Sequence, residues 1–515
     1  MTTVSANNKR IAKNTLMLYI RMFFIMAVTL YTSRVFLKTL GVEDFGIYNV
    51  VGGVVAMMGF LKGAMSAATT RFITYEIGRN DFEQLRKTYC ISMMIYGFIC
   101  FAFVVLAETI GLWFLNNQLI IPDSRMAAAN WVYQFTILSV VIDMMAQPYN
   151  AVIISHERMS FFAYISILEV ILKLLIVYML AIQPYDNLAV YGILVFCVSL
   201  IVRILYSIYC KKNFRECKFR VYRDKGLFLR LLSYSGWNLF GSISSLVKGQ
   251  GLNILLNMFF CPAVNAARGI AFQIGSAISQ FSHNFFTAVR PQIIKYYAQN
   301  DLNNMFLLVF RSSRFSFYLN LFFSVPLLIE TPQIIQLWLG QTPEYVIVFS
   351  RLIIVISAID AMAHPMMTAA HATGRVALYQ SVVGMMNILI LPISYLILRW
   401  GHSPVSVFWV SLVVTSVNVL LRVLIVKYLI KSFPLMNYLF QVCGSCLLVS
   451  LLSFIMPISF YKILAPNLWN DILICLVCVL SVIACVYLVG LTTDEKKLTN
   501  DIFKNKLLAL VKIKK

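Results

Sequence analysis

The sequence predicts an all-α polytopic membrane protein with about 14 transmembrane helices. Of its 515 residues, 60% are hydrophobic and 12% are charged, and the mean hydropathy is +0.79. A soluble domain carries roughly 25% charged residues. The apolar runs continue for about 20 residues, the length of a membrane-crossing helix, and lack the alternation of a transmembrane barrel. Because backbone polar groups in lipid must pair internally, we expect a helical bundle.

The apolar runs follow one another with short connections. The N-terminal segment has no signal-peptide pattern, so the first run, near Leu16, is expected to remain as a helix. The longest connection is a basic segment at 211–230. The predicted spans are 15–37, 46–70, 88–114, 128–152, 160–182, 188–210, 231–259, 264–289, 305–329, 345–369, 376–398, 404–430, 437–461 and 468–491.

The distribution of Lys and Arg predicts the orientation. With the N-terminus inside, roughly seven times as many basic residues lie in cytoplasmic segments as in external ones. The net charge of +22 is then explained by cytoplasmic loops rather than by nucleic-acid binding. This assignment places Arg71, Arg290 and Lys295 in cytoplasmic loops. We expect a multi-pass protein of the bacterial inner membrane with both termini in the cytoplasm, and the basic tail either lies on the anionic leaflet or is solvated.

The two halves of the chain resemble each other. The series Asp143, Pro148 and Arg158 recurs at a constant offset as Asp360, Pro365 and Arg375, and Asn80-Asp81 recurs as Asn300-Asp301. Six spans separate equivalent points, so both copies have the same orientation, as in transporters with two rocking halves. The predicted divisions are an N-terminal lobe (1–210), a basic cytoplasmic linker (211–230), a C-terminal lobe (231–431), and two extra helices with a basic tail (432–515).

Charged residues within the predicted spans are the candidate site. Each costs about 2.5–3.5 kcal/mol at mid-bilayer, so each needs a partner or a function. Glu169 and Lys173, four residues apart, are expected to pair, and several Arg near span ends can snorkel. The cations that remain lie on the helices that open each lobe, which would face each other across a cleft. They are Arg21, Arg34, Lys62, Lys248 and Arg268.

This surplus of positive charge predicts an anionic, phosphate-bearing substrate, because the Arg fork matches phosphate oxygens. The alternative for each cation is a bond to the backbone or to a polar neighbour on the next helix. Asp143 and Asp360, at equivalent repeat positions, either couple transport to an ion or form a salt bridge or helix-end contact.

No catalytic or cofactor motif stands out. The Cys443/Cys446 and Cys475/Cys478 pairs lie inside apolar runs, where packed thiols are expected instead of a metal site. There is no P-loop, HExxH or GxSxG motif. We therefore expect neither an enzyme nor a bound cofactor or metal, although proton or sodium coupling stays open.

The stretch from Ser33 to Gly53 resembles a known family. Its short turn, carried by Leu40, Gly41, Phe45, Gly46 and Tyr48, is similar to that of the polysaccharide (O-antigen or capsule repeat-unit) flippase branch of the multidrug/oligosaccharidyl-lipid/polysaccharide exporter superfamily.

The resemblance implies export of undecaprenyl-pyrophosphate-linked oligosaccharide repeat units from the cytoplasmic to the periplasmic leaflet by alternating access. It also implies membrane lipids and a polysaccharide polymerase machinery as partners. In related lipid II flippases, basic residues of helices 1, 2 and 8 line the cavity, and Arg21, Lys62 and Arg268 are the counterparts by helix.

Three other functions compete with this one. A multidrug or toxin cation antiporter of the same fold would be expected to line its cavity with acidic residues. A membrane-embedded glycan polymerase or ligase would need a large external loop, which the spans do not leave. A scaffold or receptor would not require this many buried charges.

Overall fold

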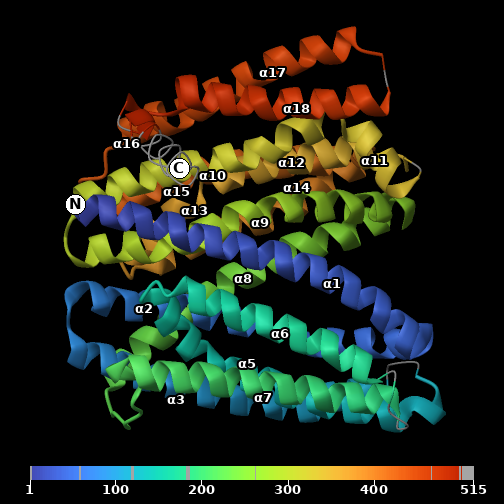
Figure 1. Cartoon of the computed structure of the whole chain (residues 1–515), viewed down its shortest axis with the longest axis vertical. Coiled ribbons are helices and arrows are strands. Elements are labelled where there is room, and N and C mark those ends of the chain that lie inside the picture. The colour runs from blue at the N-terminus through green and yellow to red at the C-terminus, as the bar shows by residue number, and fades with distance from the viewer. Residues whose placement is uncertain are drawn as a thin grey trace, which may run out of the picture. The chain divides into compact units, whose positions relative to one another are not determined.

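A computed structural model describes most of the chain, and its regular structure is helical throughout, which confirms the predicted fold class (Figure 1). Packing divides the chain into two compact units: unit 1 (Met1–Ser245, Thr287–Met305 and His371–Gly384) and unit 2 (Leu246–Phe286, Phe306–Ala370 and Met385–Lys515). The described residues are 3–56, 60–117, 121–180, 182, 186–260, 262–340, 342–465, 467–493, 495–497 and 500. The predicted lobe boundaries at 210 and 231 stay predictions.

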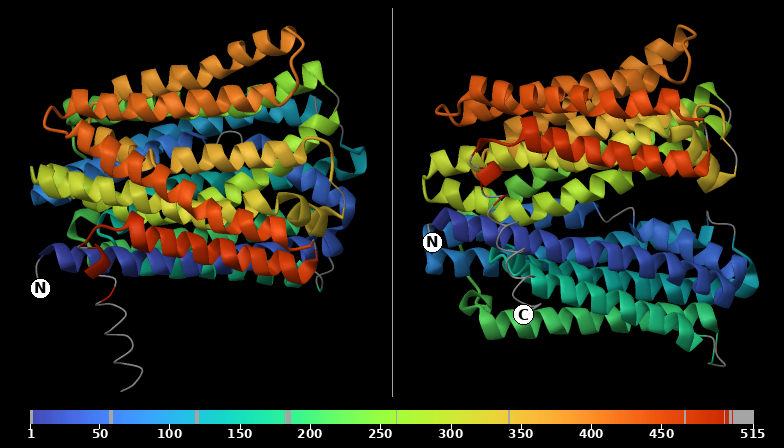
Figure 2. Two further views of the ribbon diagram at one scale, coloured as in Figure 1. Left: turned by 90° about the horizontal axis from the view of Figure 1, so that it is seen from above. Right: turned by 45° about the horizontal axis from the view of Figure 1, so that its top comes forward.

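Unit 1 is a bundle of long helices that run alongside one another (Figures 1 and 2). Helix α5 packs mainly on α7, and α1 packs mainly on α6. Buried aromatic side chains such as Tyr96 and Tyr133 fill the core. The elements are α1 (Thr3–Ala56), α2 (Phe60–Arg79), α3 (Phe82–Leu106), η2 (Ala107–Gly111), α4 (Leu112–Asn117), α5 (Asp123–Ser155), α6 (Met159–Leu180), α7 (Asn187–Asn213), η3 (Arg215–Cys217) and the first part of α8 (Lys225–Phe259).

Unit 2 begins within α8 and is again a bundle of helices. Helices α10 and α11 meet at a bend of 81°. The last part of α9, the start of α10 and the α13–α14 turn belong to unit 1. The further elements are α9 (Pro262–Ala298), α10 (Leu302–Ile329), α11 (Thr331–Leu339), α12 (Val346–Ala361), α13 (His364–Ala372), α14 (Val376–Arg399), α15 (Ser406–Leu429), α16 (Leu435–Tyr438), η4 (Leu439–Gly444), α17 (Ser445–Ile463), α18 (Leu468–Cys485) and η5 (Val486–Gly490).

Ten helices of the described chain are long and apolar enough to cross a membrane, and the bent α10–α11 pair makes up to eleven. The predicted spans without such a helix are 46–70, 231–259 and 264–289. They correspond largely to α2, α8 and α9, which are long enough but not apolar enough over their described residues. These are three of the four helices on which the sequence places the unpaired cations.

The first hairpin differs from its prediction. Residues 38–45 were expected to be a turn, but α1 is helical from Thr3 to Ala56, and the predicted span 46–70 divides between the end of α1 and α2. A straight 54-residue helix would be about 80 Å long, against about 30 Å for the hydrocarbon core. The 38–45 segment nevertheless lies at an end of unit 1, because Asp44 pairs with Arg125 at the start of α5.

The internal repeat is visible in the backbone of its turns. Asn80 (φ 57°) and Asn300 (φ 58°) both adopt the left-handed conformation, which Asn tolerates better than most residues. Each precedes an Asp that caps the next helix. Asp81 Oδ1 accepts the N–H of Gln84 at 3.0 Å, and Asp301 Oδ1 accepts the N–H of Asn304 at 3.2 Å. The duplication predicted from the sequence is therefore present as duplicated turns between α2 and α3 and between α9 and α10.

Candidate functional site

Arg21 lies on the packed face between α1 and α6 in unit 1. Its guanidinium carbon is 4.6 Å from the centre of the Phe162 ring. Its Nε is buried and has no hydrogen-bond partner among the described residues. Such a cation over an aromatic ring keeps donors available for a further acceptor. The side chains of Arg34, Lys62, Leu40 and Phe45 lie outside the described part of the structure. The surroundings of Gly41 and Gly46 lie outside it as well.

The carboxylates of unit 1 offset part of its buried positive charge. Lys173 Nζ lies 2.6 Å from Glu169 Oε1, so the ion pair predicted from their spacing is present. Glu169 is also within electrostatic range of Arg21, and Asp143 is within range of Lys173. Two cations and two acids thus follow one another across α1, α6 and α5. Arg21 does not stand as an isolated surplus charge.

Lys248 belongs to a mixed cluster in unit 2. Asp360, near the end of α12, accepts a hydrogen bond from Arg422 of α15 at 3.0 Å. Lys248 and His364 are both within electrostatic range of the same carboxylate. The Asp360 carboxylate therefore faces two basic side chains, Arg422 and Lys248. The salt bridge matches one of the two predictions for Asp360, while ion coupling by Asp143 or Asp360 stays a prediction.

Arg268 is held between α8 and α9. Its side chain is buried, and the guanidinium donates to Asn253 Oδ1 and, at 2.8 Å, to the carbonyl of Gly249. The same group stacks over Phe272 at 4.9 Å. Both acceptors are neutral, so the charge is solvated by dipoles without being cancelled by a carboxylate. We call Lys248 of α8 and Arg268 of α9 together the α8–α9 cation pair, although each has its own contacts: Lys248 faces Asp360, and Arg268 contacts Asn253 and Gly249.

The structure shows two further arginines, Arg71 and Arg290, whose buried contacts sequence analysis missed. Arg71 is buried in α2 and donates to the carbonyls of His371 (3.2 Å) and Ala372 (2.6 Å). Arg290, in α9, donates to the carbonyl of Ala67 at 3.3 Å. Tyr234 lies within electrostatic range of both. The assignment of Arg71 and Arg290 to loops was wrong, because α2 and α9 continue beyond their apolar windows.

Three side chains of unit 1 meet at Glu157, in the turn between α5 and α6. The fully buried carboxylate accepts Arg10 Nε at 2.6 Å and Gln292 Nε2 at 2.8 Å, and it also pairs with Lys295. Arg10 comes from α1, and Gln292 and Lys295 come from α9. Residues from both predicted lobes therefore share one carboxylate, and we call this group the Glu157 latch. Lys295, too, was wrongly placed in a loop.

A second group of ion pairs, which we call the Arg125 clamp, lies at the other end of unit 1. Arg125 lies 2.5 Å from both Asp44 Oδ2 and Asp186 Oδ2, and it joins α1 to the starts of α5 and α7. Partial burial raises the pKa of Asp186, but hydrogen bonds from Arg125 and from the Ala189 and Leu188 N–H groups outweigh it. The pKa of Asp186 is therefore lowered from its ordinary value.

The cysteine pairs are free thiols, two of them buried and two partly buried. Cys443, Cys446, Cys475 and Cys478 are free and lie within helical segments. Over the described chain, no group of three or more His, Cys, Asp or Glu side chains could hold a metal ion.

The fold is shared with solved transporter structures. A MATE transporter in a straight conformation superimposes with a TM-score of 0.70 at 12% identity, covering 83% of this chain and 97% of that one. A MATE transporter from Vibrio cholerae has a TM-score of 0.63 at 15% identity, covering 84% and 99%. A MOP superfamily transporter from Pyrococcus furiosus, described as having a binding pocket whose reverse polarity suggests a different function, has a TM-score of 0.67 at 12% identity, covering 82% and 96%.

These likenesses define the class, a multi-pass membrane protein with the fold of MOP superfamily transporters. In sequence, residues 11–297 match the family described as polysaccharide biosynthesis protein, and the chain belongs to that family. The resemblance inferred from the Leu40–Tyr48 motif is thereby confirmed. No curated protein matches the chain.

Proposed function

We propose that this protein moves undecaprenyl-pyrophosphate-linked oligosaccharide repeat units from the cytoplasmic to the periplasmic leaflet of a bacterial inner membrane, by alternating access. The observation that carries the proposal is the α8–α9 cation pair. Among the described residues, the Arg268 guanidinium donates to neutral acceptors, and Lys248 and Arg422 both face the Asp360 carboxylate. Positive charge retained at such a site favours an anion, and a pyrophosphate offers several oxygens to a guanidinium and an ammonium group.

The polarity of the helices supports the same proposal. Helices α2, α8 and α9 are too polar to face lipid all round, as expected of helices that line a hydrated path for sugars. In this proposal Lys248 and Arg268 bind the pyrophosphate, Arg21, Arg34 and Lys62 are predicted further contacts, and the lipid tail stays in the bilayer. The Glu157 latch must open for the substrate to enter or leave at that end.

The rival function is a cation antiporter of the same fold. The sign of the retained charge argues against it, because a cationic drug would be repelled by Lys248 and Arg268. The Pyrococcus furiosus protein, described as having a pocket of reverse polarity, supports the view that pocket charge and substrate change together within this fold.

The decisive experiment is a flipping assay with the purified protein in liposomes and a defined lipid-linked oligosaccharide. We expect Lys248→Gln with Arg268→Gln to lower the initial rate at least tenfold, because each charge-assisted contact contributes about 1.5–3 kcal/mol. The matched control is Arg399→Gln with Lys462→Gln, which removes two cations outside the predicted spans. Wild-type flipping by the Lys248/Arg268 variant, or proton-driven efflux of a cationic dye by the native protein, would overturn the proposal.

Because Arg268 joins α8 to α9, the Arg268→Gln substitution can lower the yield of folded protein. Arg268→Lys is therefore included, since it keeps the charge and one donor but loses the fork. An intermediate flipping rate at an equal amount of folded protein is expected of a pyrophosphate contact. If Arg268→Lys and Arg268→Gln lower the rate equally and only in proportion to folded yield, then Arg268 is a packing residue.

A further inference from the structure

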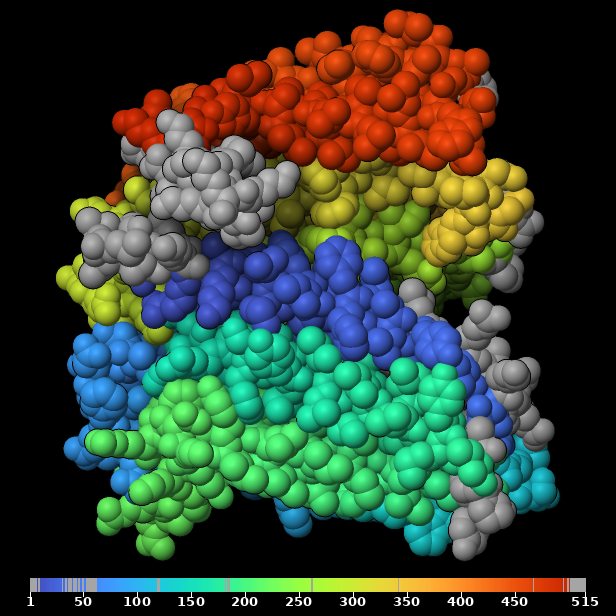
Figure 3. All heavy atoms as spheres, in the orientation of Figure 1, coloured from blue at the N-terminus to red at the C-terminus, as the bar shows by residue number. Residues whose placement is uncertain are grey.

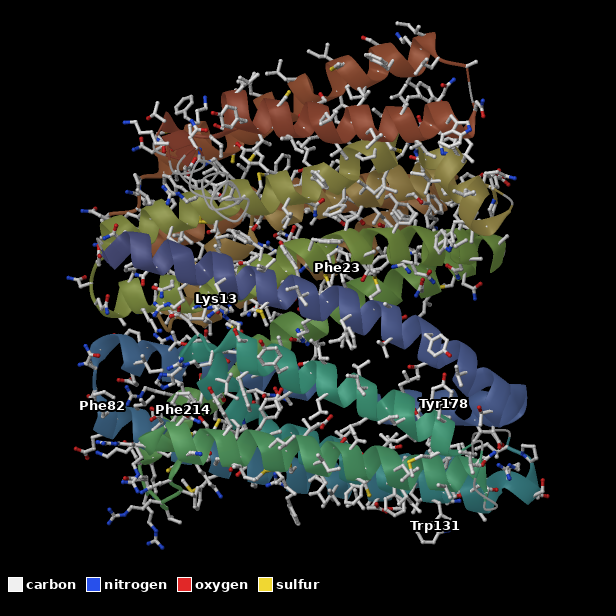
Figure 4. The ribbon with its side chains drawn as sticks, in the orientation of Figure 1. Lys13, Phe23, Phe82, Trp131, Tyr178 and Phe214 are labelled. Carbon is white, nitrogen blue, oxygen red and sulfur yellow. The ribbon has the colours of Figure 1, made fainter. Side chains whose placement is uncertain are left out.

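A cavity of about 1140 Å³ opens at one end of unit 1. Its walls come from the start of α3, the α5–α6 turn, the end of α7 and the segment that leads from α7 to α8. In Figure 4, Phe82 and Phe214, which both line it, lie at the same end of the unit. A volume near 1000 Å³ is at the large end of small-molecule sites. The transport proposal makes no use of this cavity.

The lining of the cavity is strongly basic. Four arginines contribute to it: Arg86, Arg215, Arg220 and Arg223. Over the described residues, none of the four is ion-paired.

Two acids, Glu83 and Glu216, lie in the same wall, so the four arginines outnumber them. Glu83 pairs with Lys87 at 2.7 Å, and Glu216 pairs with His156 at 2.6 Å. The guanidinium groups therefore form a surplus of positive charge around an open volume, and a surplus of this kind selects an anion.

The wall of the cavity is fixed by hydrogen bonds and stacking. Arg86 Nε donates to the Lys218 carbonyl at 3.3 Å, and the Arg220 N–H donates to the Cys90 sulfur at 3.3 Å. Phe214 stacks on the His156 ring at 4.3 Å. These contacts tie the α7–α8 segment to α3 and α5, so the backbone that carries three of the arginines is positioned before any ligand arrives.

Large apolar side chains surround the same arginines. Phe82 is 72% exposed, Val221 is 64% exposed and Phe219 is 55% exposed. Figure 3 shows the green segment that carries the last two at the surface of the unit. Apolar side chains interleaved with cations at the end of a membrane helix bundle are typical of contact with lipid at the bilayer surface.

We propose that this cavity binds the phosphate headgroup of an anionic membrane lipid, with the guanidinium groups on the phosphate oxygens and the acyl chains against Phe82, Phe219 and Val221. A free phosphate has the same oxygens but nothing that would cover the apolar rim. The lipid is a resident ligand, distinct from the transported substrate.

The test uses the full-length protein in a neutral detergent, titrated with a soluble short-chain phosphatidylglycerol and, in parallel, with inorganic phosphate. We expect the lipid to bind and Arg220→Gln with Arg223→Gln to weaken its binding about 30-fold, since each cation near an anionic headgroup contributes about 1 kcal/mol. Both arginines are exposed, so the fold is expected to tolerate the change. The matched control is Lys211→Gln with Lys212→Gln, exposed cations of the same region outside the cavity, with an expected loss of about twofold or less.

The outcomes separate the possibilities. A loss confined to the arginine variant, together with weak binding of inorganic phosphate, supports a lipid site. Equal losses in both variants would show general surface attraction and overturn the proposal. Inorganic phosphate binding as tightly as the lipid would also overturn it, in favour of a soluble anion. The flipping assay is read separately, so failure here leaves the transport proposal standing.

Discussion

At the scale of single residues, Glu157 joins more of unit 1 than any sequence pattern indicated. It lies in a short turn and adopts the left-handed conformation (φ 58°). From the sequence alone, an acid in such a turn would be predicted to be exposed to solvent. Its carboxylate is instead fully buried, whereas Lys295 is 15% exposed and Arg10 is 46% exposed. A buried carboxylate shared by two cations is costly to lose, because the cations stay behind.

The first prediction concerns this carboxylate. Glu157→Gln preserves shape but leaves Lys295 buried without its counter-ion, so we expect a destabilisation of about 3 kcal/mol. Thermal unfolding of the purified protein in detergent measures it. Glu83→Gln, which breaks the more exposed pair with Lys87, serves as the control and is expected to cost about 0.5 kcal/mol or less. Equal effects of the two substitutions would mean that the Glu157 latch contributes no more than a surface pair.

The Arg125 clamp predicts a pH dependence. The folded state holds the pKa of Asp186 below its model-compound value of 3.8, so the contribution of Asp186 to stability is complete above about pH 4 and is lost as the pH falls through the lowered pKa. Arg125→Gln removes the cause. The difference in Tm between wild type and this variant should therefore be constant from pH 8 to 6 and shrink below about pH 4. A constant gap down to pH 3 would contradict the assignment.

At the scale of elements, the duplicated turns are the clearest match between sequence and structure. Asn80-Asp81 and Asn300-Asp301 stood out as a repeated pair, and the backbone shows why both residues recur. Asn adopts positive φ at low cost, and Asp caps the helix that follows. The sequence thus predicted a local conformation, not only a relation between halves.

The prediction at the scale of elements tests these turns. Asn80→Ala forces a Cβ-bearing residue without a compensating amide into the left-handed region and should destabilise by about 1 kcal/mol. Asn80→Gly should be neutral or nearly so, because Gly takes positive φ freely. Thermal unfolding of both variants, and of the same pair at Asn300, measures this. If Ala is tolerated as well as Gly at both positions, then backbone strain does not explain the repeat.

The elements that sequence analysis described least well are the polar ones. Hydropathy located α3, α5, α6, α7, α14, α15 and α18 closely because lipid-facing helices must be apolar. It ended α2 and α9 too early, so Arg71, Arg290 and Lys295 were read as loop cations. The positive-inside rule uses only the number of cations near span ends. It cannot tell a solvated arginine from one that donates to buried carbonyls, as Arg71 does.

At the scale of the whole molecule, alternating access requires contacts that break during each cycle. We propose the Glu157 latch as such a contact, since Arg10 and Glu157 come from the predicted N-terminal lobe and Lys295 comes from the predicted C-terminal lobe. The repeat in the sequence predicts two lobes, but it does not predict the latch. That contact joins residues far apart in the chain, and no local pattern records the pairing.

A prediction at the scale of the whole molecule follows from this requirement. The double variant Glu157→Cys, Lys295→Cys is made in a protein without the native cysteines, and its two new cysteines are joined by a short reducible cross-linker. Export of surface glycan should then fall to the level of cells that carry only the empty vector. Reduction of the cross-link should restore it. The matched control is Glu83→Cys with Lys87→Cys, an ion pair within one helix whose cross-linking should leave export unchanged. Full export with the 157–295 cross-link in place would show that this end does not open.

Gly374 occupies the repeat position equivalent to Glu157, because each directly precedes one of the repeated arginines, Arg375 and Arg158. Both residues have positive φ. In one copy a carboxylate receives the neighbouring cations. In the other copy, backbone carbonyls take the place of the carboxylate, and the residue has no side chain. A Cβ at Gly374 would lie 3.0 Å from the Arg71 guanidinium. The two equivalent turns therefore differ, since one holds a charge and the other leaves no room for a side chain. In a saturation screen for glycan export, substitutions at Glu157 should be graded by charge, while those at Gly374 should be rejected whatever their charge.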